Sequence, residues 1–511
     1  MSEAEPSQKQ RDTTGAARRI DPSFSALPAK ELADAALEVA RRKGAKYADF
    51  RLEYHRRQTL EAKERDLERV SDSETLGFAV RVLADGAWGF QASDVLSIDA
   101  AADAASRAVD TAKSLARVSD YQVRLAPEEP HKGEWVSEYS IDPFDVSLDE
   151  KVAYLLEVND IVLSGGTAKY CSFWLDQVKE IKFLCSSEGT ETTQQRVRMQ
   201  GNFQATTVTE EGELVELRSN AMPQGRGFEF VHDYDFKAKA REHNELLAEK
   251  CKAKSVEPGR YDLVIDPTNL WLTIHESIGH ATELDRALGF EANYAGTSFA
   301  TPDKLGSLRY GSECVTVIGD RTQRYGLATI GWDDDGVEAQ SWDIIRDGIF
   351  VGYQYNREIA AAHGLGRSNG CAYADSWEHV PIQRMANVSL QPAPEDITLE
   401  DLLSQVDRGI YIVGDNSWSI DMKRLNFQFT GQLFYLVERG RIVGMLKDVA
   451  YQGNTIEFWN SCAAVGGPST YVLGGAFNCG KGQPGQVAPV SHGAPVALFR
   501  NVNVLNTGRA P

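Results

Sequence analysis

The pattern of hydrophobic residues changes at Gly259, and this change limits the fold more than any other feature of the chain. From Gly259 onward helical periodicity becomes scarce, and short β-like runs such as YDLVIDP and ECVTVIGD stand among many glycines. The turn sequences RDG and RGR separate alternating stretches, which is typical of antiparallel hairpins. We therefore expect residues 259–511 to form a β-rich, largely antiparallel domain.

The first half of the chain mixes helical and strand patterns. Residues 25–120 contain a helical segment, two strand-like stretches, the second of which folds back at an ADG turn, and an Ala-rich amphipathic helix. Residues 121–258 begin with a linker and continue with a helix that opens at Ser147, three β-like runs and a charged helix. The expected fold class is α+β, with two small N-terminal α/β modules before the β-rich domain and a disordered polar tail over residues 1–24.

Composition excludes several classes of protein. The 511 residues include 54 Lys and Arg against 74 Asp and Glu, a formal net charge of −20, without the basic stripe that nucleic-acid backbones require. The sequence contains no apolar stretch long enough for a membrane span and no recognisable signal peptide. Seven cysteines without framework spacing fit a reducing compartment. We expect a cytoplasmic protein that binds neither nucleic acid nor membrane.

The segment that carries chemistry is the helix expected over residues 269–288, because it contains the sequence HESIGH. His275 and His280 are five residues apart, which places their side chains roughly 140° apart around a regular α-helix. The rings therefore converge on one metal only if a wide turn with an i→i+5 hydrogen bond interrupts the helix, and Gly279 is best able to take a distorted backbone. Glu276 would then lie beside the metal, where it can accept a proton from an activated water.

Two histidines leave one ligand position of a catalytic zinc site to be filled, because such a site uses three protein ligands and keeps one position open. Cys462, Cys479 and His492 are the candidates near the end of the chain. A thiolate is a strong zinc ligand, and both cysteines have glycines nearby that give the backbone freedom to reach inward. The chemistry of the two cysteines alone does not decide between them.

A set of motifs resembles the TldD/PmbA family of zinc peptidases. HESIGHATELD is followed by GWDDDG, SWEHVPIQRMANV, GIYIVGD and CGKGQPGQ, and the resemblance covers roughly residues 45–508. It implies an N-terminal α/β region, a C-terminal β-rich region and one zinc ion per chain. It also implies that His275, His280 and the cysteine that opens the CGK motif, Cys479, are the metal ligands. The residues after Lys481 depart slightly from the family pattern.

Other polar residues in these motifs have less specific interpretations. Asp333–Asp335 look like a metal cluster, but acidic residues before a glycine are ordinary turn chemistry, so we expect a turn or a solvated loop. His379 lies inside a family motif and is a candidate substrate-binding residue, with a structural histidine as the alternative. Glu283 and Asp285 are either partners that orient a ligand imidazole or exposed carboxylates at a helix end.

These features predict a zinc metallopeptidase in which Glu276 is the general base toward a zinc-activated water. The family resemblance implies unfolded or leader-type peptides as substrates. The alternative is a non-catalytic zinc-containing subunit that binds peptide or a partner protein. The intact HExxxH sequence argues against this alternative, because a structural zinc site needs four ligands and has no use for the glutamate. A zinc hydrolase of non-peptide amides is a third hypothesis.

The resemblance further implies a dimer, with a related subunit that lacks the metal motif as the expected partner. The residues add a modest argument, since several aromatic side chains lie where few helices are available to cover a sheet face. An uncovered apolar face is typical of a protein interface, whereas two sheets that cover each other are the alternative. The aromatic residues are Trp332, Trp342, Tyr353, Tyr355 and Trp377.

Overall fold

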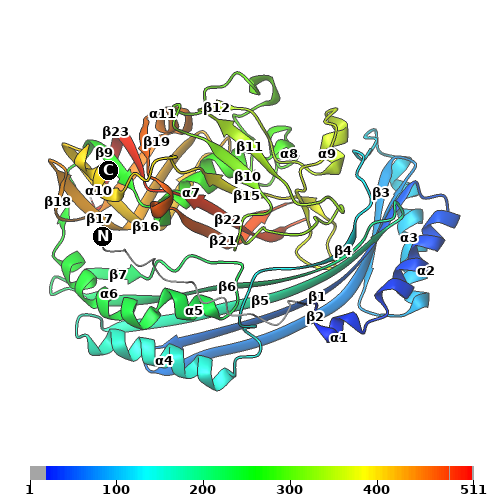
Figure 1. The fold of residues 1–511 in the computed structure, drawn as a ribbon, viewed down its shortest axis with the longest axis horizontal. Helices are drawn as coiled ribbons and strands as arrows, with labels where there is room; N and C mark the ends of the chain where they lie inside the picture. Colours follow the sequence, from blue (N-terminus) through cyan, green and yellow to red (C-terminus); the bar gives the residue numbers. More distant parts are fainter. Residues whose placement is uncertain (1–18, 483, 509–511) are drawn as a thin grey trace, which may run out of the picture.

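The structure, a computed structural model, describes residues 19–482 and 484–508. Figure 1 shows a long curved N-terminal sheet with helices on its outer side and a β-rich C-terminal body on its inner side. The α+β fold class expected from the sequence is confirmed, including the largely antiparallel C-terminal region. Within the described ranges, every helix is too short or too polar to cross a membrane.

Strands from both expected N-terminal modules belong to a single sheet. Its order is β3-β2-β1-β5-β6-β4, and β7 pairs with β6. The two modules meet where β1 pairs antiparallel with β5, and part of the expected linker forms β4, which pairs parallel with β6. The strands are β1 (Tyr47–Lys63), β2 (Asp66–Ala84), β3 (Ala87–Ser93), β4 (Lys132–Val136), β5 (Tyr170–Ser186), β6 (Glu191–Val208) and β7 (Leu214–Arg218).

Two groups of helices cover this sheet. The alanine-rich faces of α2 and α3 pack on β1 and β2, whereas α4 and α6 pack on the part formed by β5, β6 and β7. Ser97 caps α3, and Ser147 caps α4 as expected. The helices are α1 (Pro22–Ser25), α2 (Ala29–Arg42), α3 (Ile98–Ala116), α4 (Leu148–Ser164), α5 (Glu229–Tyr234) and α6 (Phe236–Cys251).

The disorder expected over residues 1–24 is wrong for the described residues 19–24. Residues 1–18 lie outside the described part of the chain. Ile20 and Phe24 are buried in the core that α2 and α3 form with the sheet, and α1 begins at Pro22. Because two apolar side chains are enough to anchor such a short segment, the polar composition of the whole stretch was misleading.

The C-terminal region is built from sheets of different sizes, in which most strand pairs are antiparallel and the β16–β9 and β18–β8 pairs are parallel. The largest has the order β16-β9-β23-β19-β17-β18-β8, and an additional β16–β17 pairing closes five of its strands into a ring. A four-stranded sheet has the order β12-β11-β10-β15, and β21 and β22 form a separate hairpin. The strands are β8 (Lys254–Ser255), β9 (Gly259–Ile265), β10 (Val317–Asp320), β11 (Ser341–Arg346), β12 (Ile349–Phe350), β13 (Ala372–Tyr373), β14 (Ile382–Gln383), β15 (Asn387–Leu390), β16 (Arg408–Ile420), β17 (Asn426–Glu438), β18 (Arg441–Lys447), β19 (Val449–Asn454), β20 (Cys462–Val465), β21 (Val472–Lys481), β22 (Gln486–Ala494) and β23 (Ala497–Asn506).

The helix expected over residues 269–288 is present but not continuous. The α-helix α7 (Pro267–Ile274) is followed by a π-helical turn at His275–Gly279, a 3₁₀ turn at His280–Thr282, an extended Glu283 and the short α8 (Leu284–Ala287). The other elements of this region are α9 (Arg357–Ala362), α10 (Leu399–Ser404), α11 (Thr455–Asn460) and 3₁₀ turns at Pro302–Lys304 and Pro468–Thr470.

The three expected hairpin turns are confirmed. The ADG turn joins β2 to β3, RDG joins β11 to β12, and RGR joins β17 to β18. In each turn the two central residues have positive φ, for example 52° at Asp85 and 82° at Gly86. Such a turn matches the right-handed twist of the paired strands, which is why an Asp-Gly pair gives a reliable signal.

The run Asp333–Asp335 joins the two halves of the molecule and is buried, so the expectation of a solvated loop was wrong. Asp334 contacts Lys182 Nζ on β5 at 3.0 Å, and Asp335 contacts Arg81 Nη2 on β2 at 2.8 Å. Asp333 has the expected turn role, because its side chain accepts hydrogen bonds from backbone N–H groups of the same turn. The cations that compensate the other two carboxylates come from distant strands, which the local sequence does not show.

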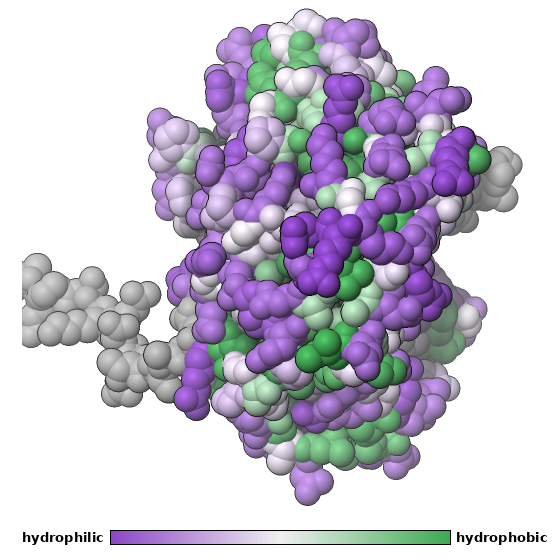
Figure 2. All heavy atoms as spheres, turned by 90° about the vertical axis from the view of Figure 1, so that its right-hand side faces the viewer, coloured by the Kyte–Doolittle hydropathy of each residue, from purple (hydrophilic) through white to green (hydrophobic). Residues whose placement is uncertain are grey.

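The aromatic side chains expected on an uncovered face are covered. Tyr353 is buried, and the other four are partly buried. Trp377 packs against Gly77 of β2, and Trp332 lies beside His131, so the N-terminal sheet supplies much of the cover. The face turned to the viewer in Figure 2 is mostly hydrophilic, with hydrophobic residues in small groups. These aromatic side chains therefore do not by themselves mark an interface, and the dimer stays a prediction.

Candidate metal centre

The wide turn predicted from the spacing of the two histidines is confirmed. The N–H of His280 donates to the carbonyl of His275, which is the i→i+5 bond that brings positions five apart into line. Ser277 at the middle of the turn is fixed from outside the helix. Trp459 Nε1 donates to Ser277 Oγ at 2.9 Å, and the Tyr310 hydroxyl donates to the Ser277 carbonyl.

Gly279 serves side-chain packing and not the distorted backbone that was predicted for it. Its φ of −52° and ψ of −61° are ordinary right-handed helical values, which any residue adopts. A Cβ atom at this position would instead lie 2.6 Å from Met385 Sδ and 3.5 Å from His492 Cε1. The glycine therefore allows close packing of the turn, because its lack of a side chain leaves room for Met385.

We expect Gly279→Val to lower zinc occupancy and to destabilise the fold by about 1–3 kcal/mol, because the branched side chain overlaps Met385. Metal analysis of the purified variant and its thermal unfolding measure the two effects. Gly444→Ala is the control, since a Cβ there meets no atom within 4 Å. Full zinc occupancy in Gly279→Val with wild-type stability contradicts the packing argument.

The structure brings His275, His280 and Cys479 together. Their candidate ligand atoms all lie within 4.8 Å of one another, and all three residues are buried. Cys479 is on β21, next to the turn that carries the histidines, and its Sγ lies 3.6 Å from His280 Nε2. A tetrahedral zinc ion with ordinary bond lengths separates a nitrogen and a sulfur ligand by about 3.6 Å. The donor set and its spacing therefore fit zinc.

Hydrogen bonds fix the tautomers of both histidines so that each directs a free Nε2 toward the cluster. His492 Nδ1 donates to the Val388 carbonyl at 2.8 Å, so its Nε2 accepts from His275 Nδ1 at 2.7 Å. His280 Nδ1 donates to Glu283 Oε2 at 2.8 Å. Of the two roles considered for Glu283, the orienting one matches the structure.

The ionisation of these groups also suits a cation. Burial lowers the pKa of His275, so the ring is neutral and its Nε2 lone pair is available. Burial opposes ionisation of Cys479, but the nearby His280 ring and Arg384 guanidinium outweigh it and lower the pKa of the thiol. Both effects favour the protonation states that metal ligands need.

We expect His492→Ala to weaken zinc binding about 10- to 100-fold, because loss of this partner frees the His275 ring to rotate and to change tautomer. Competition with a chromophoric chelator measures the affinity. His379→Ala is the matched control, because His379 lies outside the cluster. Equal zinc affinity in His492→Ala and the wild type contradicts the orienting role.

Glu276 lies beside the two histidines and forms an ion pair that the sequence did not reveal. Arg424 Nη1 donates to Glu276 Oε2 at 2.6 Å. Burial raises the pKa of this carboxyl, but nearby groups that include the Arg424 guanidinium outweigh it, so the pKa is lower than usual and Glu276 is ionised at neutral pH. Arg424 stands in the turn between β16 and β17, about 150 residues away, and nothing local in its sequence indicates this contact.

Lys481 is the second residue that the sequence interpretation missed. Its Nζ lies 3.0 Å from Glu283 Oε1, 2.9 Å from Asp285 Oδ1 and 3.4 Å from Glu291 Oε1, and the side chain is fully buried. A signal was available, because residues two apart on a strand share a face, and Cys479 and Lys481 are two apart. The lysine therefore holds Glu283, which in turn orients His280.

The remaining candidates lie outside the cluster. Cys462 is beside Cys314, and His492 contacts His275 as described. His379 Nδ1 is hydrogen-bonded to Asp375 Oδ1 at 2.6 Å. A part in substrate binding for His379 stays a prediction.

A second group of possible ligands, Glu53, His55 and Glu180, does not suit a metal ion. Lys182 Nζ lies 3.5 Å from Glu53 Oε2, and Arg196 and Arg198 both pair with Glu180. These cations already compensate the carboxylates, so an added divalent cation would be repelled. The group is an ion-pair network in the N-terminal sheet.

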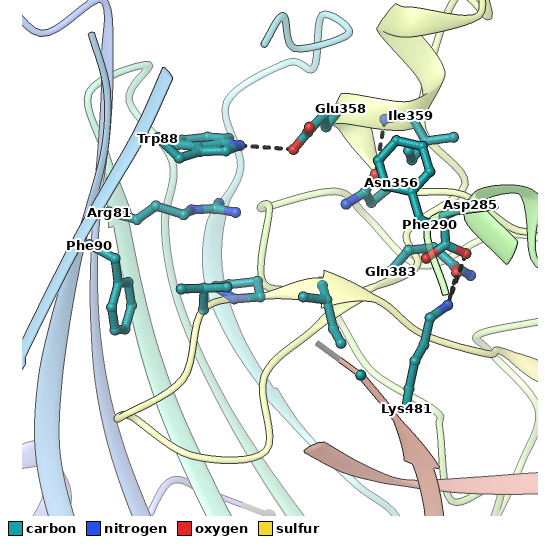
Figure 3. A pocket seen from close by; sticks show the side chains of 14 residues that line it. Arg81, Trp88, Phe90, Asp285, Phe290, Asn356, Glu358, Ile359, Gln383 and Lys481 are labelled. Carbon is teal, nitrogen blue, oxygen red and sulfur yellow. Dashed lines mark hydrogen bonds and ion pairs between the residues drawn. The ribbon is translucent and has the colours of Figure 1, made fainter. Parts of the chain in front are cut away.

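A pocket of about 220 Å³ lies next to the metal cluster, between the N-terminal sheet and the C-terminal body. Figure 3 shows Trp88 and Phe90 on one side, Phe290 and Ile359 on the other, and Lys481 at the base with Asp285. Trp88 Nε1 donates to Glu358 Oε2 at 2.8 Å. Because Lys481 lines the pocket and also holds Glu283, the pocket and the metal cluster share one charged network.

Comparison with known proteins gives consistent results over most of the chain. Sequence models of three PmbA/TldA metallopeptidase domains match in order: domain 1 at residues 48–116, the central domain at 141–256 and the C-terminal domain at 258–506. A metalloprotease of Methanothermobacter thermautotrophicus is 29% identical over 90% of this chain and 96% of the relative. A zinc metalloprotease TldD homolog of Saccharolobus solfataricus is 24% identical over 92% and 98%.

Solved structures agree on the fold. A crystal structure of a Thermotoga maritima protein has a TM-score of 0.73 and 18% identity, and covers 93% of this chain and 100% of its own. TldE from Thermococcus kodakarensis has a TM-score of 0.69 and 16% identity, with 92% and 99% covered. At these identities the likeness concerns the arrangement of the chain.

Proposed function

Since the chain belongs to the TldD/PmbA family of metallopeptidases, we propose that it is a zinc-dependent enzyme that hydrolyses peptide bonds in unfolded or leader-type peptides. The single observation that supports this most strongly is the convergence of His275, His280 and Cys479 with Glu276 beside them. Three ligands and an adjacent carboxylate are typical of a catalytic zinc site, which keeps a position open. One zinc ion per chain is part of the proposal.

Each residue of the centre has a distinct part in this proposal. His275, His280 and Cys479 hold the ion, and His492 and Glu283 keep the two rings oriented. Zinc bound there supplies Lewis acidity toward water and toward the carbonyl of the scissile bond. Arg424 holds Glu276 Oε2, which leaves Oε1 to accept the proton of the attacking water and pass it to the leaving amine.

The rival hypothesis is a non-catalytic subunit that binds peptide. It requires only that the metal cluster stabilise the fold.

The test of the proposal is to incubate the purified chain, alone and with the products of neighbouring genes, with a peptide mixture and to identify products by mass spectrometry. We expect cleavage that a chelator abolishes and added zinc restores. Peptide binding without any cleavage, by zinc-loaded protein in every combination, contradicts the enzymatic proposal.

We expect the substrate to bind in an extended conformation, as a strand added near the zinc ligands. β21, which carries Cys479, pairs only with β22 among the described strands, so its other edge has no strand partner. Backbone pairing holds a peptide with little demand on its side chains, which favours flexible substrates of varied sequence. Cleavage rates for a flexible peptide and for the same sequence inside a compact domain measure this. Equal rates contradict it.

A dimer with a related, metal-free subunit completes the proposal, together with a cytoplasmic location. The family resemblance supports the dimer. A cavity enclosed by two subunits would also explain how the enzyme spares folded neighbours. Light scattering of the chain with and without the candidate partner tests the assembly. A stable monomer that degrades peptides unaided contradicts the dimer but leaves the peptidase proposal intact.

A further inference from the structure

Two cysteines outside the metal centre lie close enough to react with each other. Cys314 Sγ is 3.7 Å from Cys462 Sγ, although the residues are far apart in the sequence. The seven cysteines, all within the described ranges, are free thiols. A disulfide requires an S–S distance of about 2.05 Å, so the two side chains have to approach by about 1.7 Å.

The surroundings of the pair give the two sulfurs different roles. The hydrogen-bonding contact between the two thiols lowers the pKa of Cys314 to about 6 in spite of partial burial, and Ser312 Oγ lies 3.2 Å from Cys314 Sγ. Cys462 is buried, and its contact with Cys314 and its burial raise its pKa well above the usual value. Cys314 is partly exposed, whereas Cys462 is buried.

The other cysteines differ from Cys314 in acidity or role. Cys479 belongs to the metal cluster. In four others burial raises the pKa of the thiol, which disfavours the reactive thiolate; these are Cys171, Cys185, Cys251 and Cys371. A thiolate that is accessible and adjacent to a second thiol is the arrangement typical of redox-sensing cysteines.

We propose that Cys314 and Cys462 form a reversible disulfide when hydrogen peroxide reaches the protein, with Cys314 as the attacking residue and Cys462 as the resolving residue. The Cys314 thiolate attacks one peroxide oxygen, the O–O bond breaks, and hydroxide leaves as the sulfenic acid forms. The Cys462 sulfur then attacks the Cys314 sulfur, the S–O bond breaks, and the departing hydroxide takes up the Cys462 proton. Two thiols are oxidised, and one peroxide is reduced to two waters.

The disulfide would connect the two segments that hold the wide turn of the metal centre. Tyr310 precedes Cys314 by four residues, and Trp459 precedes Cys462 by three. Both aromatic residues bind Ser277, and Ser312 N donates to the Trp459 carbonyl at 3.1 Å. Oxidation at this pair therefore acts on the two segments that hydrogen-bond to Ser277 and hold the turn that carries His275 and His280.

The test is peroxide treatment of the full chain as purified, followed by differential alkylation and peptide mapping. We expect a peptide pair linked through Cys314 and Cys462 that dithiothreitol separates. Cys314 should lose its free thiol about tenfold faster than Cys251, because much more of it is thiolate at neutral pH. In Cys462→Ser, a dimedone probe should trap the sulfenic acid on Cys314. Cys251→Ser is the control and should form the link normally.

Two outcomes overturn the proposal. One is that Cys314 keeps its free thiol under peroxide that oxidises Cys251. The other is that Cys462→Ser protein shows no dimedone adduct on Cys314. Both readouts concern the thiols themselves, so they stand whether or not the protein cleaves peptides.

Discussion

Glu276→Gln should bind zinc like the wild type and cleave peptides about 10²- to 10⁴-fold more slowly, because the carboxylate moves a proton and is not a ligand. The amide keeps the size of the side chain and its contact with Arg424, so the fold should be unaffected. Metal analysis together with the cleavage rate of a flexible peptide measures both properties.

The control for this variant is Glu395→Gln, which changes an exposed glutamate and should alter neither property. Loss of the metal from Glu276→Gln, with normal folding, would mean that Glu276 is a ligand. Full activity would remove the proposed general base. Each result contradicts the assigned role in a different way.

Lys481→Met should destabilise the protein by about 3–5 kcal/mol, because it leaves buried carboxylates without their main counter-charge. The ammonium contacts Glu283, Asp285 and Glu291, and in the variant Arg286 still pairs with Glu283 and Glu291 but not with Asp285. Urea denaturation measures the loss. Lys447→Met, which removes an exposed ion pair with Glu213, is the control and should cost less than about 1 kcal/mol.

The loss in Lys481→Met should depend on pH in a definite direction. Burial, opposed by Lys481, already raises the pKa of Asp285 to about 6, and removing the lysine raises it further. A carboxyl whose folded pKa exceeds its unfolded value near 4 destabilises the fold above the folded pKa, and this penalty disappears as the pH falls below both values. The difference in stability between wild type and variant should therefore shrink between pH 8 and pH 4. A difference that grows toward low pH contradicts the ion-pair account.

Sequence reasoning succeeded where local geometry determines the result. The five-residue spacing of His275 and His280 excludes a regular helix if both bind one metal, and the π-helical turn is what remains. The hairpin turns were also predictable, because Asp-Gly and Arg-Gly pairs tolerate the positive φ that tight hairpins need. In these cases the prediction depends only on residues that are close together in the sequence.

Reasoning from the sequence was insufficient where contacts join distant segments. Residue chemistry did not divide Cys462 from Cys479 as the third ligand, and only the family resemblance favoured Cys479. Cys462 and Cys479 differ in their positions relative to the two histidines. The arrangement of the sheets sets these positions, and no local sequence pattern predicts them. The same holds for Arg424, whose contact with Glu276 crosses about 150 residues.

The preference for a glycine at position 279 also arises from tertiary packing. Its backbone is helical, and the side chain of Met385, more than a hundred residues away, occupies the space of a Cβ. The buried run Asp333–Asp335 shows the same limitation, since its counter-charges Arg81 and Lys182 lie on the N-terminal sheet. The charge of this run alone suggested solvent exposure. Ion pairs with distant cations allow the run to be buried instead.

The central claim is that His275, His280 and Cys479 form one zinc site. X-ray absorption at the zinc edge of the zinc-loaded full chain tests it most directly, because the method counts sulfur and nitrogen ligands around the ion. We predict two imidazole nitrogens and one sulfur per zinc, with the sulfur absent from Cys479→Ala. A ligand shell without sulfur in the wild type, or an unchanged shell in the variant, contradicts the claim.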